Sequence, residues 1–288
     1  MARPCPEPRR VQPDADRPGA AALVAICGVW LACSLGLSGC AAIEDLGYQT
    51  NPNSTSILDL WRRPPPDQPV AWALDIHNAD NRYRGVTLLS DAPFAGDDLY
   101  LQLFIESADD SDSAVRTAAI RGLARHGRPE HAPIIAEALT DDSVLVRLEA
   151  ARAAQRIHNP AIVSSLFARL DPEAEREHDV RAAAAHALGQ YPQPRVLDQL
   201  VAALRDPSLT VNRHAAEALT ILTGEDLGLD PIAWLEFVRD TREPFSNAAR
   251  YRYPTFERGM RLVEYIPLYP RPPLDPPAEP IGLPKIER

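Results

Sequence analysis

The chain has 288 residues, of which 30 are basic and 40 are acidic, so its net charge is −10. Lysine occurs once, at Lys285, and arginine supplies nearly all of the positive charge. An acidic chain of this kind is a poor candidate for general nucleic-acid binding, which needs an excess of basic groups to neutralise phosphates. The length fits one large or two small domains.

The amino-terminal segment has the pattern of a targeting signal. Several arginines precede an apolar run over residues 20–37, and the tetrapeptide Leu-Ser-Gly-Cys ends the run at Cys40. This tetrapeptide resembles the lipobox of bacterial lipoproteins, which implies that residues 1–39 are removed as a signal peptide and that Cys40 is lipidated. Acyl chains would then hold the protein on a membrane of the bacterial cell envelope, facing the periplasm. An uncleaved anchor and an ordinary signal peptide are the alternatives.

We expect no intramolecular disulfide in the mature protein. All four cysteines lie in the first 40 residues, at positions 5, 27, 33 and 40. Cleavage before Cys40 would leave that residue alone, so the fold has to be stabilised by apolar packing even in an oxidising compartment.

Residues 40–70 predict a flexible tether between the anchor and the rest of the chain. This stretch contains Asn-Pro-Asn-Ser-Thr-Ser at 51–56 and three successive prolines at 64–66. Such segments favour extended conformations and do not form a packed core.

A phrase that begins with Val-Arg and continues into alanines returns four times in the middle of the chain, with Asn212 in place of the arginine in the last copy. Its first residues are Val115, Val146, Val180 and Val211, which stand 31, 34 and 31 residues apart. Each phrase follows a second apolar stretch, and both have apolar residues at three- and four-residue intervals, which is typical of helices. A fixed period of this length indicates a stacked-repeat protein in which each unit is a helical hairpin.

The segment Asp179–Gly189 resembles HEAT repeats, in particular the short repeats of phycobilisome-lyase-like proteins. The resemblance covers about 160 residues and implies an all-α fold over residues 71–240. We expect an α-solenoid of about four to five HEAT-like hairpins, an ARM-type superhelix with disordered termini. An eroded first copy is expected near Tyr83, which precedes Val115 by 32 residues.

Two further features predict how the helices pack. Small residues four and seven positions after each valine should let neighbouring helices approach closely. At the end of the array, Asp230 and Pro231 predict a helix start, and Trp234, Phe237 and Val238 should cover the open face of the last repeat.

The arginine that follows the valine has an expected structural role. In HEAT proteins, this arginine usually bonds to loop aspartates of adjacent repeats. The resemblance therefore implies a ladder made by Arg116, Arg147 and Arg181 with Asp112, Asp142 and Asp179.

The inner helices carry a candidate binding face. Six and ten positions after the valine, the first two repeats present Arg121, Arg125, Arg152 and Arg156. Because guanidinium groups suit carboxylates, this face is a candidate site for an acidic protein partner. The alternative is a solvated face that Glu149 partly neutralises.

His186 and Glu217 occupy the same helical column, and His214 lies one turn before Glu217. The three side chains are a weak candidate for a mixed histidine–carboxylate metal site, and we expect solvated or packed histidines and no cofactor. HEAT-type di-iron hydroxylases use adjacent His-Glu pairs, and this chain contains no His-Glu dipeptide.

Residues 241–288 predict a proline-rich tail that is largely disordered. Five aromatic residues, Tyr251 and Tyr253 among them, are placed to pin its first half onto the solenoid.

No catalytic motif is present: the chain lacks G-x-S-x-G, a P-loop and G-x-G-x-x-G. We therefore expect a non-catalytic protein-binding or scaffold module of the cell envelope, with an unidentified protein partner, no small-molecule substrate and no nucleic acid. A bilin-lyase-like enzyme or metal-dependent hydroxylase is the alternative, and a purely structural envelope component is a third hypothesis.

Overall fold

The computed structural model describes residues 67–254 and 277–284. All of them belong to the unit formed by residues 65–288. The predicted signal peptide, the candidate lipidation site Cys40 and the predicted tether up to residue 66 lie outside the described residues. The tether was predicted to end at residue 70, but residues 67–70 already belong to a helix over Asp67–Ala73.

Helices account for nearly all regular structure in the described ranges. The α-helices are α3 (Asp67–Ala73), α4 (Ala79–Ser90), α5 (Asp98–Ser107), α6 (Ser113–His126), α7 (Ala132–Ala138), α8 (Val144–Arg156), α9 (Val163–Leu170), α10 (His178–Leu188), α11 (Pro194–Ala203), α12 (Leu209–Thr223) and α13 (Pro231–Asp240). Two 3₁₀ turns, η2 (Pro129–His131) and η3 (Pro160–Ile162), precede α7 and α9. None of these helices is both long and apolar enough to cross a bilayer.

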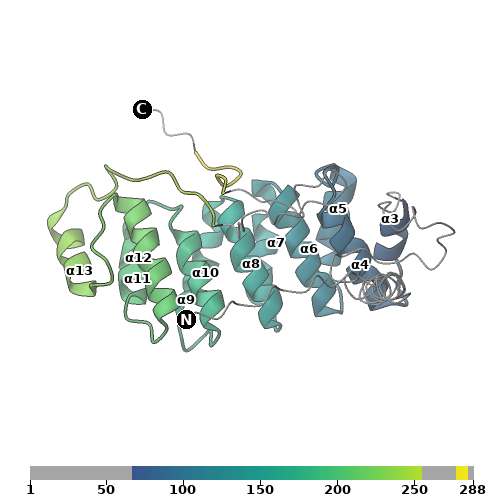
Figure 1. The fold of residues 1–288 in the computed structure, drawn as a ribbon, viewed down its shortest axis with the longest axis horizontal. Helices are drawn as coiled ribbons and strands as arrows, with labels where there is room; N and C mark the ends of the chain where they lie inside the picture. Colours follow the sequence, from purple (N-terminus) through teal and green to yellow (C-terminus); the bar gives the residue numbers. More distant parts are fainter. Residues whose placement is uncertain (1–66, 255–276, 285–288) are drawn as a thin grey trace, which may run out of the picture. The chain divides into compact units, whose positions relative to one another are not determined.

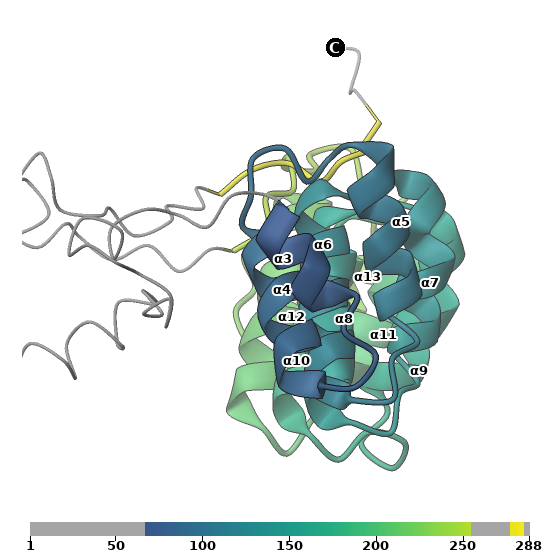
Figure 2. The ribbon, with the colours of Figure 1, turned by 90° about the vertical axis from the view of Figure 1, so that its right-hand side faces the viewer.

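The helices form two layers that follow the chain in order (Figures 1 and 2). The first layer contains α4, α6, α8, α10 and α12, in which each helix packs against the next. The second layer contains α5, α7, α9, α11 and α13, each of which is joined to the first layer by a short loop. The predicted all-α solenoid of helical hairpins is confirmed.

Small residues set the spacing in the first layer. Eight small residues stand four and seven positions after Val115, Val146, Val180 and Val211. Seven of them are alanines, and all seven are fully buried: Ala119, Ala150, Ala153, Ala184, Ala187, Ala215 and Ala218. The eighth small residue is Gly122, where an added Cβ would stand 2.9 Å from the ring of Phe104 in α5. Larger side chains would therefore force the layers or the neighbouring repeats apart.

An arginine ladder connects the successive repeats. Each ladder arginine donates from Nε and Nη2 to both oxygens of one loop carboxylate in the next repeat. The pairs are Arg82–Asp110, Arg116–Asp141, Arg147–Glu175 and Arg181–Asp206, with Nε–O distances of 2.6 to 2.7 Å. The Nη1 atom of each arginine also donates to two backbone carbonyls in the loop before its own helix.

The ladder carboxylates differ from the predicted ones. Asp112 is the N-cap of α6, where its side chain accepts from the amides of Ala114 and Val115. Asp142 contributes only a backbone carbonyl, to Arg147, and the side chain of Asp179 pairs with His178. The actual partners lie two residues before the helix N-caps, where each also accepts the N-cap amide.

The register expected for the first repeat was also wrong. Arg82 is the ladder arginine of α4, two residues before the position that the alignment of Tyr83 with Val115 implies. Tyr83 is 42% exposed, whereas Val115 is fully buried.

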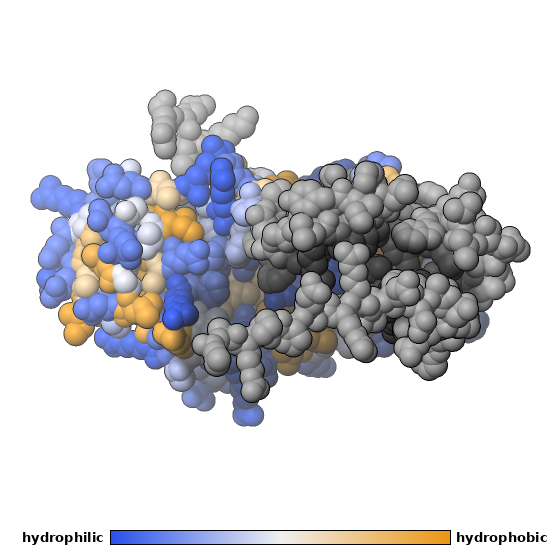
Figure 3. Space-filling view, in the orientation of Figure 1, coloured by the Kyte–Doolittle hydropathy of each residue, from blue (hydrophilic) through white to orange (hydrophobic). Residues whose placement is uncertain are grey.

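The array ends at α13, which packs against α11. Trp234 is fully buried, and its indole Nε1 donates to the carbonyl of Gly228 at 3.0 Å. At this end of the face drawn in Figure 3, apolar surface is interspersed with polar surface, and Leu229, Ile232 and Leu235 are exposed.

The described parts of the predicted tail pack against the helices without helix of their own, and residues 244–247 form a turn. From α13 the chain turns back along α12 towards α8 (Figure 1), and the amide of Ala249 donates to the carbonyl of Ile221. Tyr251 is 2% exposed. Further along, Ile281 exchanges backbone hydrogen bonds with Arg156 and His158, at 2.8 and 2.9 Å. The rest of the predicted tail lies outside the described residues.

Candidate functional site

A groove of about 590 Å³ runs across the first layer of helices. Side chains of α6, α8, α10 and α12 line it, together with Pro254. All four arginines of the predicted binding face, Arg121, Arg125, Arg152 and Arg156, are among the lining residues. They stand against two carboxylates, Glu149 and Asp179, so the lining is net positive although the whole chain is acidic.

Two of the arginines share one carboxylate. Arg121 donates from Nε and Nη2 to the two oxygens of Glu149 at 3.2 and 3.4 Å. Arg152 is one turn from Glu149 on α8 and approaches it at 3.8 Å, while 58% of its side chain is exposed. Burial would lower the pKa of Arg121, but the charge of Glu149 outweighs it and raises the pKa. Glu149 thus neutralises part of the face and leaves Arg152 directed to solvent.

The other two arginines contact residues outside the groove lining. Arg125 pairs with Asp91, just after α4, and lies 3.5 Å from the carbonyl of Ser90. The guanidinium of Arg156 lies 4.5 Å from the ring centroid of Tyr253, a cation–π contact with the returning carboxy-terminal segment. The groove is therefore built from the helices and from a segment that is distant in sequence.

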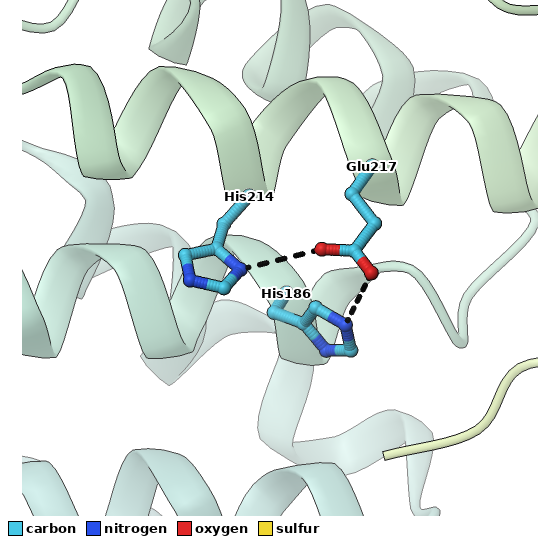
Figure 4. A group of neighbouring side chains, drawn as sticks. All are labelled: His186, His214 and Glu217. Atoms are coloured by element: carbon cyan, nitrogen blue, oxygen red, sulfur yellow. Dashed lines mark ion pairs between the residues drawn. The ribbon is translucent and has the colours of Figure 1, made fainter. Parts of the chain in front are cut away.

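A second cluster brings together His186 of α10 and His214 and Glu217 of α12 (Figure 4). The Nε2 atom of His186 lies 3.7 Å from Oε1 of Glu217, and Nδ1 of His214 lies 3.5 Å from Oε2. One potential ligand atom from each residue lies within 4.8 Å of the other two. These are the three residues of the weak metal candidate in the sequence.

The surroundings of this cluster are partly buried. The side chain of His186 is 2% exposed, and its Nδ1 is 2.8 Å from the hydroxyl of Tyr251. His186 and then His214 hold the pKa of Glu217 well below its usual range. Burial raises the pKa of Tyr251.

The spacing of the ladder carboxylates is a signal in the sequence that could have revealed them. An acidic residue stands six positions before Arg116, Arg147, Arg181 and Asn212, at Asp110, Asp141, Glu175 and Asp206. By contrast, the repeat spacing does not predict the contact between Tyr251 and His186, which are 65 residues apart in the sequence.

Comparison with known proteins identifies the repeats. Residues 101–178 and 170–236 match the family of HEAT repeats, so the chain carries HEAT repeats from α5 into α13. Such repeats suggest a protein-interaction or scaffold module. No curated protein sequence matches the chain.

One solved structure that resembles the chain is that of YibA from E. coli, a structural genomics target. It is 24% identical, with a TM-score of 0.45. The match covers 54% of this chain and 59% of that one.

Proposed function

We propose that the protein is a non-catalytic scaffold of the bacterial cell envelope, lipid-anchored at Cys40, whose groove binds an acidic segment of another protein. The observation that carries the binding proposal is the placement of Arg121, Arg125, Arg152 and Arg156 around one groove. This concentration of positive charge occurs on a chain with a net charge of −10.

The chemistry of the groove favours carboxylates as ligands. Arginine presents its donors in a planar fork that matches a carboxylate, and its charge persists at any physiological pH. Because 58% of the Arg152 side chain is exposed and its ion pair with Glu149 is long, at 3.8 Å, an incoming acidic side chain can replace solvent without breaking a short ion pair. A hollow of about 590 Å³ has room for side chains of an extended segment rather than for a whole domain.

The binding proposal is tested by charge reversal. A variant with the four groove arginines changed to glutamate is compared with the parent in partner capture from solubilised envelope. A matched control carries four Arg→Glu changes at exposed positions outside the groove lining, Arg176, Arg205, Arg213 and Arg242. A four-fold Arg→Gln groove variant removes the charge without repelling Glu149.

We expect the parent and the control variant to capture the same acidic partner, and both groove variants to lose it while retaining the parent's helical circular dichroism. Added salt should weaken capture by the parent, because exposed charges are screened. Identical partner sets for the parent and both groove variants would contradict the proposal.

The anchor is tested separately at Cys40. Mass spectrometry of the mature protein should find its amino terminus at an acylated Cys40, and Cys40→Ser should abolish acylation and leave residues 1–39 attached, because cleavage follows lipidation. A protein that is not acylated, or that keeps residues 1–39 with Cys40 intact, would overturn the lipoprotein assignment.

A further inference from the structure

We propose that His186, His214 and Glu217 bind one divalent transition-metal ion, best suited to zinc, which links helix α10 to helix α12. The site goes beyond the scaffold function and does not rest on the arginine groove. Imidazole nitrogens with one carboxylate oxygen are a ligand set that zinc accepts.

The distances suit a single ion. With bonds of about 2.0–2.1 Å, neighbouring ligand atoms of a tetrahedral zinc stand roughly 3.3–3.5 Å apart. The carboxylate oxygens of Glu217 lie 3.7 Å from His186 and 3.5 Å from His214, close to this spacing. All three ligand atoms lie within 4.8 Å of one another, so the remaining adjustment is about an ångström. Side-chain rotation of His214 and Glu217, which are 34% and 55% exposed, can supply it.

A partner already orients the buried histidine. The hydroxyl of Tyr251 holds Nδ1 of His186 at 2.8 Å, while Nε2 faces Glu217 (Figure 4). Metal-bound histidines almost always have their second nitrogen hydrogen-bonded in this way, which fixes the ring and the tautomer. The imidazole of His186 is therefore held with Nε2 directed at the proposed ion.

The second histidine has an unexplained polar atom. Nδ1 of His214 is buried and makes no hydrogen bond. Its ion-pair partner, Oε2 of Glu217, lies 3.5 Å away. Buried polar atoms without partners are uncommon, and an ion is one of the accepted explanations. A metal between the three side chains satisfies this nitrogen.

One side of the cluster is open. His214 belongs to the lining of the groove, and 55% of the side chain of Glu217 is exposed. Three protein ligands with an open fourth position leave room for water, and the ion can enter without unfolding of the repeat. Because the ligands come from two successive helices of the first layer, the bound ion would brace α10 against α12.

The proposal is tested by metal titration of the full chain after chelator treatment. Co²⁺ is used as a spectroscopic probe and Zn²⁺ as a competitor, with the melting temperature as a second readout. We expect one Co²⁺ per chain with visible bands typical of nitrogen and oxygen ligands, displacement by Zn²⁺, and a higher melting temperature with Zn²⁺.

Variants locate the site. His214→Ala and Glu217→Gln change partly exposed residues and should each weaken binding at least about tenfold, without loss of helical structure. Tyr251→Phe removes the partner of His186 and should weaken binding about 10- to 100-fold. The matched control is His178→Ala, an exposed histidine of α10 outside the cluster, which should bind like the parent.

Cysteine thiolates are competing ligands, four in the full chain and Cys40 alone after the proposed cleavage, and they give intense near-ultraviolet charge-transfer bands that nitrogen and oxygen ligands lack. The proposal is overturned if Co²⁺ gives only the thiolate spectrum, if the His214→Ala and Glu217→Gln variants bind like the parent, or if no Co²⁺ binds.

Discussion

Among the ladder arginines, Arg181 makes the most buried ion pair. Its side chain is 6% exposed and that of Asp206 is 3% exposed, and their closest atoms are 2.7 Å apart. The same guanidinium donates to the carbonyls of Glu175 and Arg176, so one side chain holds two loops and two helices.

Removal of this arginine should destabilise the protein strongly. Arg181→Ala leaves the carboxylate of Asp206 buried without a counter-charge, and such a loss typically costs about 3–5 kcal/mol. The control is Arg239→Ala, because the Arg239–Asp240 pair is 69% and 65% exposed and should contribute less than about 1 kcal/mol. Urea unfolding measures both, and equal effects of the two changes would refute the ladder's structural role.

The sequence predicted the ladder arginines of three repeats but not their partners. The phrase Val-Arg identifies the arginine because the valine must face the core and the next residue must point along the layer. The choice of carboxylate depends on loop geometry: Oδ1 of Asp112 caps α6, and Asp110, two residues earlier, pairs with Arg82 of α4. Helical periodicity alone does not encode that loop conformation.

At the level of helices, close packing of α10 between α8 and α12 depends on alanine. Ala184 is fully buried at this seam. Ala184→Leu adds three carbons to a filled space, and overpacking of this kind costs about 1–3 kcal/mol.

The matched control for that substitution is Ala202→Leu, at an exposed position of α11. We expect a clearly lower melting temperature for Ala184→Leu and little change for Ala202→Leu. An unchanged melting temperature for Ala184→Leu would show that the seam is looser than the structure indicates.

Helix order, capping by Asp230 and burial of Trp234 follow from local patterns, and they agree with the sequence analysis. Local patterns do not predict how the chain after α13 packs. Its prolines predict extended chain, but the burial of Tyr251 against His186 comes from long-range packing that composition does not reveal.

For the whole molecule, the ladder makes stability depend on pH. Burial would raise the pKa values of Asp110, Asp141 and Glu175, but hydrogen bonds from their arginines and from backbone amides outweigh it and lower each pKa. A carboxyl with a depressed folded-state pKa stabilises the fold above its unfolded pKa, near 3.8 for Asp and 4.5 for Glu. This contribution is lost as the pH falls through the folded value.

We therefore expect the free energy of unfolding to fall steadily from about pH 5 to pH 3, as protons bind preferentially to the unfolded chain. Asp110→Asn should be less stable than the parent at pH 7 and should show a shallower fall. Stability that is constant or rises between pH 5 and pH 3 would contradict this account of the ladder.

The central claim is that the groove of the first layer receives an acidic protein in the envelope. Site-specific photo-crosslinking in intact cells tests it most directly, with the reactive group at Thr210, an exposed residue of the groove lining, or at Ala202 on the second layer. We expect an acidic protein to be crosslinked from Thr210 and not from Ala202, and the product to disappear when the four groove arginines are changed to glutamate. Absence of a product specific to Thr210, or one that persists in the charge-reversed variant, would contradict the claim.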